Sequence, residues 1–466
     1  MKISIMKPQL NIFFRIIIAV IFFMVMAAIF YDYSIDISPL VVAVLLYVYA
    51  RFFKKIEAFL SLMDLYILVT LAIVASIVIT STFKIPGYGI PAISFVILVT
   101  LLFDSLEFSF FFSLFFFFLG AGIEGGTLSI GCGLFAGSLI AAILSFRVHK
   151  RFEVIKAGIL GGFVQFIVIF IIERIKKEEI FLYLNTGDLE LLKICLLSGI
   201  SSCLVFAFLP FFEYIFRVVT NISLLELSDF NQPLLRKLIL EAPGTYQHSL
   251  VVANLSEAAA DSIGANSLLA RVGAYYHDIG KMIKPNYFVE NVVGYKDVHR
   301  DLKPSMSKLI IINNVKDGVD LAKKYRLKPR VIDFIAEHHG KSLVYYFYQR
   351  AKELEPEKEH EESYRYAGPK PQSKETAIVC LADTIEALSR TLEEPTPSRI
   401  EEMARDVIKK KFMDGELDES TLTLKDLEKI TQKFIHMLNA LFHTRINYPK
   451  ENCRSNKPPK EKENTD

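Results

Sequence analysis

Long apolar segments fill the first 216 residues, whereas charged positions interrupt the apolar ones throughout the rest of the chain. Eight apolar segments can be drawn in this first part, at about residues 12–30, 37–53, 59–83, 88–103, 108–123, 128–146, 154–172 and 191–212. A helix needs about 20 residues to cross a bilayer core, with about 17 as the lower limit, so the fourth and fifth segments are marginal. The pattern predicts a polytopic transmembrane bundle of about eight spans over residues 1–216, with the first segment kept as an anchor.

Residues 217–446 show the spacing of apolar positions that is typical of soluble helices. One such pattern covers residues 250–263, and Pro304 and Pro329 suit the first turns of two further helices. Alternation with the two-residue period of a strand is scarce. The sequence therefore predicts an all-α soluble domain over 217–446, followed by a disordered Pro-, Lys-, Glu- and Asn-rich tail over 447–466.

Basic residues predict the orientation of the spans, because Lys and Arg gather in the cytoplasmic loops of membrane proteins. The loops assigned to that side contain Lys2 and Lys7, then Arg51, Lys54 and Lys55, then Arg147, Lys150, Arg151 and Lys156. The alternate loops at 31–36 and 120–126 have neither Lys nor Arg, and the loop with Arg174, Lys176 and Lys177 is the exception. An even number of spans then places both termini and the soluble domain in the cytoplasm.

Composition narrows the classes of function. The chain is 52% hydrophobic with a mean hydropathy of +0.35, which is high for a soluble enzyme. Its net charge of +2 and the lack of a Lys/Arg-rich run argue against a nucleic-acid polymer as partner. The five cysteines are scattered without a CxxC spacing, which argues against a disulfide or a cysteine metal site.

An ordered series of histidines and aspartates runs through the soluble domain, and in chain order it comprises His248, His277-Asp278, His338-His339 and Asp383. Imidazole and carboxylate groups are ligands of first-row divalent metals. A carboxylate directly after a histidine can bridge two ions while the imidazole holds one of them. Two ions a few ångströms apart can share a hydroxide and hold both oxygens of a phosphodiester displacement. The series predicts a metal-dependent phosphohydrolase of the HD type.

The motifs around these residues resemble the seven-transmembrane HD-domain family. They are LLELSD (224–229), EAPGTY (241–246) leading to His248, GAYYHDIGK (273–281), VKDG (315–318), EHHG (337–340), GPKPQ (368–372), LAD (381–383) and DG (414–415). Characterised members of this family are bacterial cyclic di-AMP phosphodiesterases, which open the cyclic dinucleotide to linear pApA. The resemblance implies that substrate, a role in second-messenger signalling, and a multi-pass protein of the bacterial inner membrane with its HD domain in the cytoplasm.

The resemblance also implies two divalent ions, with Mn or Fe as the expected metals. One ion would be held by His248, His277, Asp278 and Asp383, and the other by Asp278, Asn314, His338 and His339. Asn314 stands where the family has a histidine, and its carbonyl oxygen is a weaker ligand than imidazole. His299 is the alternative donor that would take the place of the missing histidine.

Two lysines are the candidate phosphate contacts. Lys281 lies one turn beyond His277 and is expected to place its ammonium on the non-bridging phosphate oxygens, a catalytic role alongside that of Asp278. The alternative role of Lys281 is a structural ion pair with a carboxylate. Lys284 is the candidate for a second phosphate contact.

The chain departs from the family between its first two apolar segments, where only about six residues stand instead of a large extracytoplasmic domain. Two alternative functions stay open. The chain is either a non-catalytic receptor for cyclic di-AMP, which Asn314 favours, or an HD hydrolase of another nucleotide. The oligomeric state is open as well, with a homodimer as one candidate.

If charge sets the topology, a reporter fused at the N-terminus and one fused after Arg217 should both behave as cytoplasmic. Alkaline phosphatase and a fluorescent protein respond oppositely to the two compartments, so each fusion can be scored twice. A fusion in the loop at 31–36 is the control and should give the external response. An external signal at either of the first two points would contradict the eight-span arrangement.

Overall fold

The computed structural model describes residues 41–42, 44, 59–122, 127–146, 148, 150–177, 185–216, 218–292, 298–354 and 360–442. Within these ranges the regular structure is helical, apart from an isolated antiparallel bridge between Leu343 and Arg365. The predicted all-α class is therefore confirmed.

The apolar part of the chain forms α3 to α9. Their bounds are α3 Phe59–Ile77, α4 Ala92–Phe103, α5 Leu106–Gly122, α6 Leu128–Ser145, α7 Arg151–Lys176, α8 Thr186–Ile200 and α9 Ser202–Phe216, with a π turn at Val78–Thr82 and a 3-10 turn at Gly87–Gly89. By length and composition, three helical stretches can cross a membrane, namely Leu128–Ser145, Arg151–Lys176 and Thr186–Phe216. Shorter apolar helices cover Ile67–Thr82, Gly87–Phe103 and Leu106–Gly122.

Six of the eight predicted apolar segments thus coincide with apolar helices. The segment at 12–30 lies outside the described residues, and so does that at 37–53 apart from residues 41, 42 and 44. The count of eight spans and the orientation stay predictions.

Glycines allow the membrane-type helices to pack closely. A Cβ on Gly161 of α7 would lie 2.7 Å from the carbonyl oxygen of Gly137 in α6, so neither position has room for a side chain. Such contacts between small residues are typical of helices that pack within a bilayer, where there is no hydrophobic drive between helices. Large apolar side chains on the outer faces, such as Leu160, Leu204 and Phe208, are exposed, as expected for a surface covered by lipid.

The rest of the chain forms a second helical body. The helix α10 Asn221–Leu227 comes first, and the helices of this body are α11 Pro233–Glu241, α12 Pro243–Ser262, α13 Ser267–Tyr276, α14 Pro304–Lys324, α15 Pro329–Glu337, α16 Tyr345–Leu354, α17 Lys374–Ser389, α18 Pro397–Met413 and α19 Leu424–Leu441. The helix predicted at 250–263 corresponds to the later part of α12. The helix itself begins earlier, with Pro243 in its first turn. The two helices predicted to start at Pro304 and Pro329 do start there.

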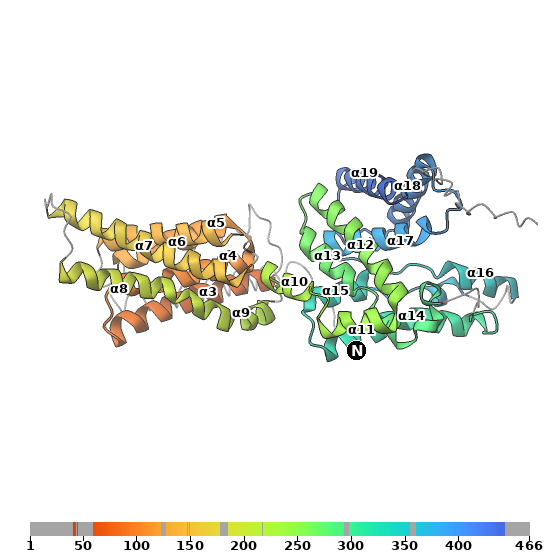
Figure 1. Cartoon of the computed structure of the whole chain (residues 1–466), viewed down its shortest axis with the longest axis horizontal. Coiled ribbons are helices and arrows are strands. Elements are labelled where there is room, and N and C mark those ends of the chain that lie inside the picture. The colour runs from red at the N-terminus through yellow and green to blue at the C-terminus, as the bar shows by residue number, and fades with distance from the viewer. Residues whose placement is uncertain are drawn as a thin grey trace, which may run out of the picture.

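Figure 1 shows the two bodies, α3 to α9 and α11 to α19, with α10 between them. Ile222 of α10 belongs to the apolar core of the first body, and Leu224 belongs to that of the second. The predicted boundary at 216/217 falls between α9 and α10. The predicted tail at 447–466 lies outside the described residues.

Candidate metal centre

Four helices of the second body bring the predicted ligands together. His248 lies in α12, His277 and Asp278 follow α13, His338 and His339 follow α15, and Asp383 lies in α17. Phe334 and Ile335 of α15 and the apolar residues that flank Asp383 in α17 are buried, so the ligands lie inside the domain. Each of His277, Asp278 and His338 is at most 2% exposed.

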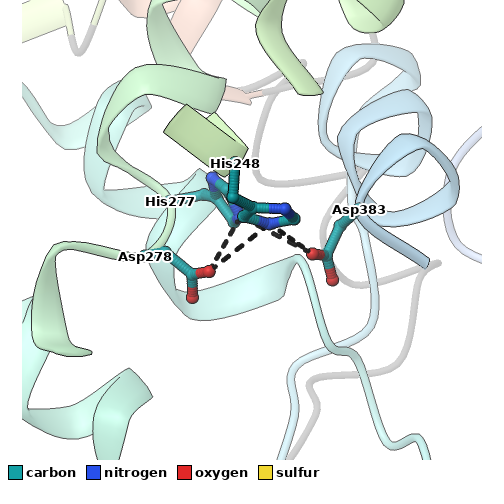
Figure 2. Close-up of side chains that lie close together, drawn as sticks. All are labelled: His248, His277, Asp278 and Asp383. Carbon is teal, nitrogen blue, oxygen red and sulfur yellow. Dashed lines mark hydrogen bonds and ion pairs between the residues drawn. The ribbon is translucent and has the colours of Figure 1, made fainter. Parts of the chain in front are cut away.

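The first ligand group comprises His248, His277, Asp278 and Asp383, whose ligand atoms all lie within 4.8 Å of one another. Figure 2 shows the two imidazoles between the two carboxylates. His248 Nε2 lies 3.0 Å from Asp383 Oδ1 and 3.6 Å from Asp278 Oδ2, and His277 Nε2 lies 3.3 Å from Asp278 Oδ2. Ligands held about 2.1 Å from a tetrahedral ion are about 3.4 Å apart, so these separations fit one divalent ion.

The second ligand group comprises Asp278, His338 and His339. His338 Nε2 lies 3.6 Å from Asp278 Oδ1, whereas the first group uses Oδ2 of the same carboxylate. Asp278 therefore stands between the two groups with one oxygen toward each. This is the arrangement expected of a carboxylate that bridges two ions.

Hydrogen bonds on the outer side of the His277 and His338 imidazoles direct their Nε2 atoms inward. His277 Nδ1 donates to the carbonyl oxygen of Ala274 at 2.7 Å, and His338 Nδ1 donates to that of Phe334 at 3.0 Å. A carbonyl only accepts, so Nδ1 carries a proton and Nε2 is the atom that each of these rings presents to the centre. Outer partners of this kind are typical of metal-ligating histidines.

His248 is oriented by a carboxylate that the sequence reasoning missed. Its Nδ1 lies 2.5 Å from Glu386 Oε2, and Glu386 Oε1 accepts a hydrogen bond from Arg390 Nε at 2.5 Å. Glu386 is 2% exposed and lies one turn beyond Asp383 on α17. That helical spacing after a predicted ligand was the signal that the sequence offered.

Several buried polar atoms of the centre lack hydrogen-bond partners within the described part of the chain. They are His277 Nε2, His338 Nε2 and Asp278 Oδ1. A buried polar atom without a partner costs about 1–3 kcal/mol, and more when it is charged. Because these atoms converge on one point and have the chemistry of metal ligands, the residues present fit divalent ions.

Charge inside the centre is strongly coupled. Burial opposes the ionised form of Asp278, but Lys281 and His277 outweigh burial and hold the pKa of the carboxyl well below its usual range. Burial likewise opposes charge on His277, yet Asp278 and Asp383 outweigh it and raise the pKa of the imidazole to about 10. The metal-free centre therefore holds a proton on His277 at neutral pH. A metal must displace that proton, so its affinity increases as the pH rises.

Lys281 is part of the same centre. Its Nζ lies 2.8 Å from Asp278 Oδ2 and 2.8 Å from Glu290 Oε1. Glu290, which the sequence reasoning missed, also accepts a hydrogen bond from Thr245 Oγ1 at 3.1 Å. Lys281 thus does pair with carboxylates, the alternative role considered for it above. It also lines the adjoining cavity, so it remains a candidate phosphate contact.

That cavity has a volume of about 440 Å³ and opens beside the second ligand group. Its polar wall has Lys281, Glu290, Asn314 and His339, and the remaining lining residues are Tyr287, Phe288, Val289, His299, Ile311, Tyr346, Phe347 and Tyr366. An ammonium group beside metal ligands can contact a phosphate, and aromatic rings provide faces on which bases can stack. The aromatic wall could not be anticipated, because its residues come from separate segments.

The other predicted residues differ in their relation to the centre. Asn314 is buried in α14 and lines the cavity with His339, but its role as a ligand stays a prediction. His299 lines the cavity too, and its Nε2 donates to the carbonyl oxygen of Tyr287 at 2.8 Å. Lys284 is exposed and is not among the residues that line the cavity, so its phosphate contact also stays a prediction.

Comparisons with known proteins agree with this geometry. The family described as a 7TM receptor with intracellular HD hydrolase matches residues 37–220, and the HD domain family matches residues 245–388. The cyclic-di-AMP phosphodiesterase PgpH of Bacillus subtilis (strain 168) is 43% identical over 312 residues, which cover 66% of this chain and 43% of the relative. PgpH of Listeria monocytogenes serotype 1/2a is 40% identical over 301 residues, which cover 64% of this chain and 41% of the relative.

A solved structure of the L. monocytogenes PgpH HD domain in complex with cyclic-di-AMP is 47% identical in sequence. The match covers 46% of this chain and 100% of that chain, with a TM-score of 0.44. The present chain spans about two fifths of the length of the curated PgpH relatives.

We expect Asp278→Ala to abolish metal binding and to lower any hydrolytic rate by at least about 10³-fold, the scale on which a metal-activated nucleophile operates. The change removes the carboxylate that both ligand groups share. Metal content per purified chain and far-UV circular dichroism are the measurements, since the helical fold should persist. Asp261→Ala, at an exposed position of α12, is the control and should keep its metal. Near-normal turnover in the Asp278 variant would exclude the metal mechanism.

We expect Asn314→His to strengthen the second ion, because it adds one nitrogen donor where the family has histidine. Loss of a ligand or its support commonly costs about 10–100-fold in affinity. The native second ion should thus be lost on dialysis while the first remains, and the variant should approach two ions per chain at lower Mn²⁺. Asn313→His, exposed on the same helix, should change nothing. An unchanged metal count in Asn314→His would mean that this position is not at the site.

Proposed function

This chain belongs to the seven-transmembrane HD-domain family, and we propose that it is a membrane-bound, metal-dependent phosphodiesterase that hydrolyses cyclic di-AMP to linear pApA. The observation that carries the proposal is the shared carboxylate of Asp278, buried between two groups of metal ligands. Both PgpH relatives, at 40–43% identity, are named cyclic-di-AMP phosphodiesterases, which supports the choice of substrate. The apolar helices α6 to α9 support the membrane location.

Two divalent ions, when bound, supply a hydroxide nucleophile and neutralise charge on the phosphate. The first ion would be held by His248, His277, Asp278 and Asp383, and the second by Asp278, His338, His339 and Asn314. Mn or Fe is the metal that we expect at both positions.

The chain's own groups would orient the substrate. Lys281 lies at the cavity wall next to Asp278, where its ammonium is placed to contact a non-bridging phosphate oxygen. The rings of Tyr346 and Phe347, on the same cavity, offer stacking faces for adenine. Hydrolysis would add the hydroxyl of one water to phosphorus and its proton to the 3′ oxygen as the bond between them breaks, so that the phosphate stays on the 5′ oxygen of the linear product.

Asn314 favours one alternative function. With a weaker donor in place of histidine, the second ion could be too sparsely bound for turnover, and the chain would then bind cyclic di-AMP as a receptor. A hydrolase acting on another nucleotide is the remaining alternative, because the cavity does not by itself select a base.

The test uses the full chain purified in detergent, with Mn²⁺ added and cyclic di-AMP, cyclic di-GMP and guanosine tetraphosphate supplied separately. We expect pApA from cyclic di-AMP, a rate that rises with Mn²⁺, and no product from the Asp278→Ala variant. Chromatography of the products identifies which bond was broken. Binding of cyclic di-AMP without product at saturating Mn²⁺ would favour the receptor, and turnover of another nucleotide alone would favour the other hydrolase.

A further inference from the structure

Among the residues that the structure describes, two ion pairs connect the apolar bundle to α10 and to the HD domain, and they differ in burial. Arg151 at the start of α7 pairs with Glu226 of α10, and these side chains are 57% and 50% exposed. Glu213 near the end of α9 pairs with Lys328, and its side chain is 1% exposed. An exposed pair contributes about 0–1 kcal/mol, whereas removing one partner of a buried pair costs about 3–5 kcal/mol.

Each oxygen of the Glu213 carboxylate accepts two hydrogen bonds. Its Oε1 accepts hydrogen bonds from the backbone N and the Oγ1 of Thr220, at 3.0 and 2.7 Å. Its Oε2 accepts from Ser223 Oγ at 2.9 Å and from Lys328 Nζ at 2.7 Å. One side chain therefore holds the end of α9, the start of α10 and the residue that precedes α15. Displacement of this carboxylate would therefore disturb its hydrogen bonds to all three elements.

The contact with Lys328 leads to the second ligand group. Lys328 precedes α15, a helix of nine residues, and His338 and His339 follow its other end directly. Val331, Phe334 and Ile335 pack this helix into the core, and His338 Nδ1 donates to the carbonyl oxygen of Phe334. Because a short packed helix moves as a unit, the position of Lys328 sets the position of both imidazoles.

The contact with Thr220 leads to the first ligand group. Thr220 caps α10, and the carbonyl oxygen of Leu227 at the other end of α10 accepts a hydrogen bond from the Tyr276 hydroxyl at 2.8 Å. Tyr276 is fully buried and immediately precedes His277. Both sides of the metal centre are thus connected to the same carboxylate at the end of the apolar bundle.

We propose that Glu213 is a positioning residue of the metal centre, which acts through Lys328 and α15 on His338 and His339, and through α10 and Tyr276 on His277. This inference rests on the proposed metal-dependent function, but it does not depend on which nucleotide is the substrate. It assigns the apolar bundle a role beyond anchoring, since the end of α9 becomes part of what holds the ligands in place.

The experiment measures Mn²⁺ binding by the full chain in detergent, by equilibrium dialysis and without nucleotide. Lys328→Gln tests the α15 connection alone. We expect it to raise the Mn²⁺ needed to half-fill the second site by roughly 10-fold, as for loss of support around a ligand, and to leave the first site unchanged. Glu213→Gln should weaken both sites. Lys328→Arg keeps the charge and the hydrogen bond and should restore binding.

The matched controls are Arg151→Gln and Glu226→Gln, which remove an ion pair at the same junction that does not reach α15. They should leave the Mn²⁺ affinity of the second site as in the native chain. The melting temperature of each metal-free variant separates loss of fold from loss of positioning. If Glu213→Gln does not fold, Lys328→Gln still decides the α15 connection, because Lys328 is 25% exposed and tolerates substitution better.

An unchanged Mn²⁺ titration in Lys328→Gln, or equal shifts in the exposed-pair controls, would overturn the inference. A native chain that binds Mn²⁺ at both sites but hydrolyses none of the nucleotides would count against the proposed enzyme and leave this inference standing. A native chain that binds no second Mn²⁺ would overturn both.

Discussion

The buried charge of Asp278 is the constraint on which the metal centre depends. A carboxylate whose side chain is 1% exposed stays ionised only with compensating polar or charged groups around it, and here Lys281 Nζ, His277 Nε2 and His338 Nε2 lie 2.8, 3.3 and 3.6 Å from its oxygens. These partners come from the end of α13, the following 3-10 turn and the end of α15. The same charge attracts divalent ions, so the ligand set and the packing of these elements follow from one requirement. Hydrogen bonds to backbone carbonyls keep the imidazoles from turning away when a proton is replaced by a metal.

Much of this centre could be predicted from sequence, because each ligand sits in a short local motif. His277-Asp278 and His338-His339 are adjacent pairs, and the order of the series along the chain is informative even without a structure. Glu386 and Glu290 escaped prediction because their roles depend on tertiary contacts. The spacing of Glu386 from Asp383 places both on one face of α17 but does not identify a partner, because Glu386 meets His248 across 138 positions of the chain. The aromatic wall of the cavity escaped for the same reason.

The fold, too, was predictable from the sequence in some parts and not in others. Hydropathy located six of the apolar helices, since burial in lipid requires continuous apolar segments and leaves a strong signal. It marked the fourth segment as marginal, and α4 is indeed only 12 residues long and ends where Asp104 adopts a left-handed conformation. The start of α12 was placed too late, because Pro243 and Gly244 were read as a motif rather than as a first turn. Gly244 has no room for a side chain against the backbone of Glu290, which is a tertiary reason for that residue.

The expected weakness of the second site and the buried ion pair of Glu213 and Lys328 are related. A tightly held ion stays bound through a tenfold change in affinity, because its concentration is far above the dissociation constant. An ion held near its dissociation constant changes occupancy most for the same tenfold change, which corresponds to about 1.4 kcal/mol. With Asn314 in place of an imidazole, the second ion is the one expected to lie in that range. His338 and His339, which would hold it, are also the ligands that α15 connects to Lys328 and Glu213. A small displacement at the end of α9 would therefore have its largest effect on the occupancy of the second site.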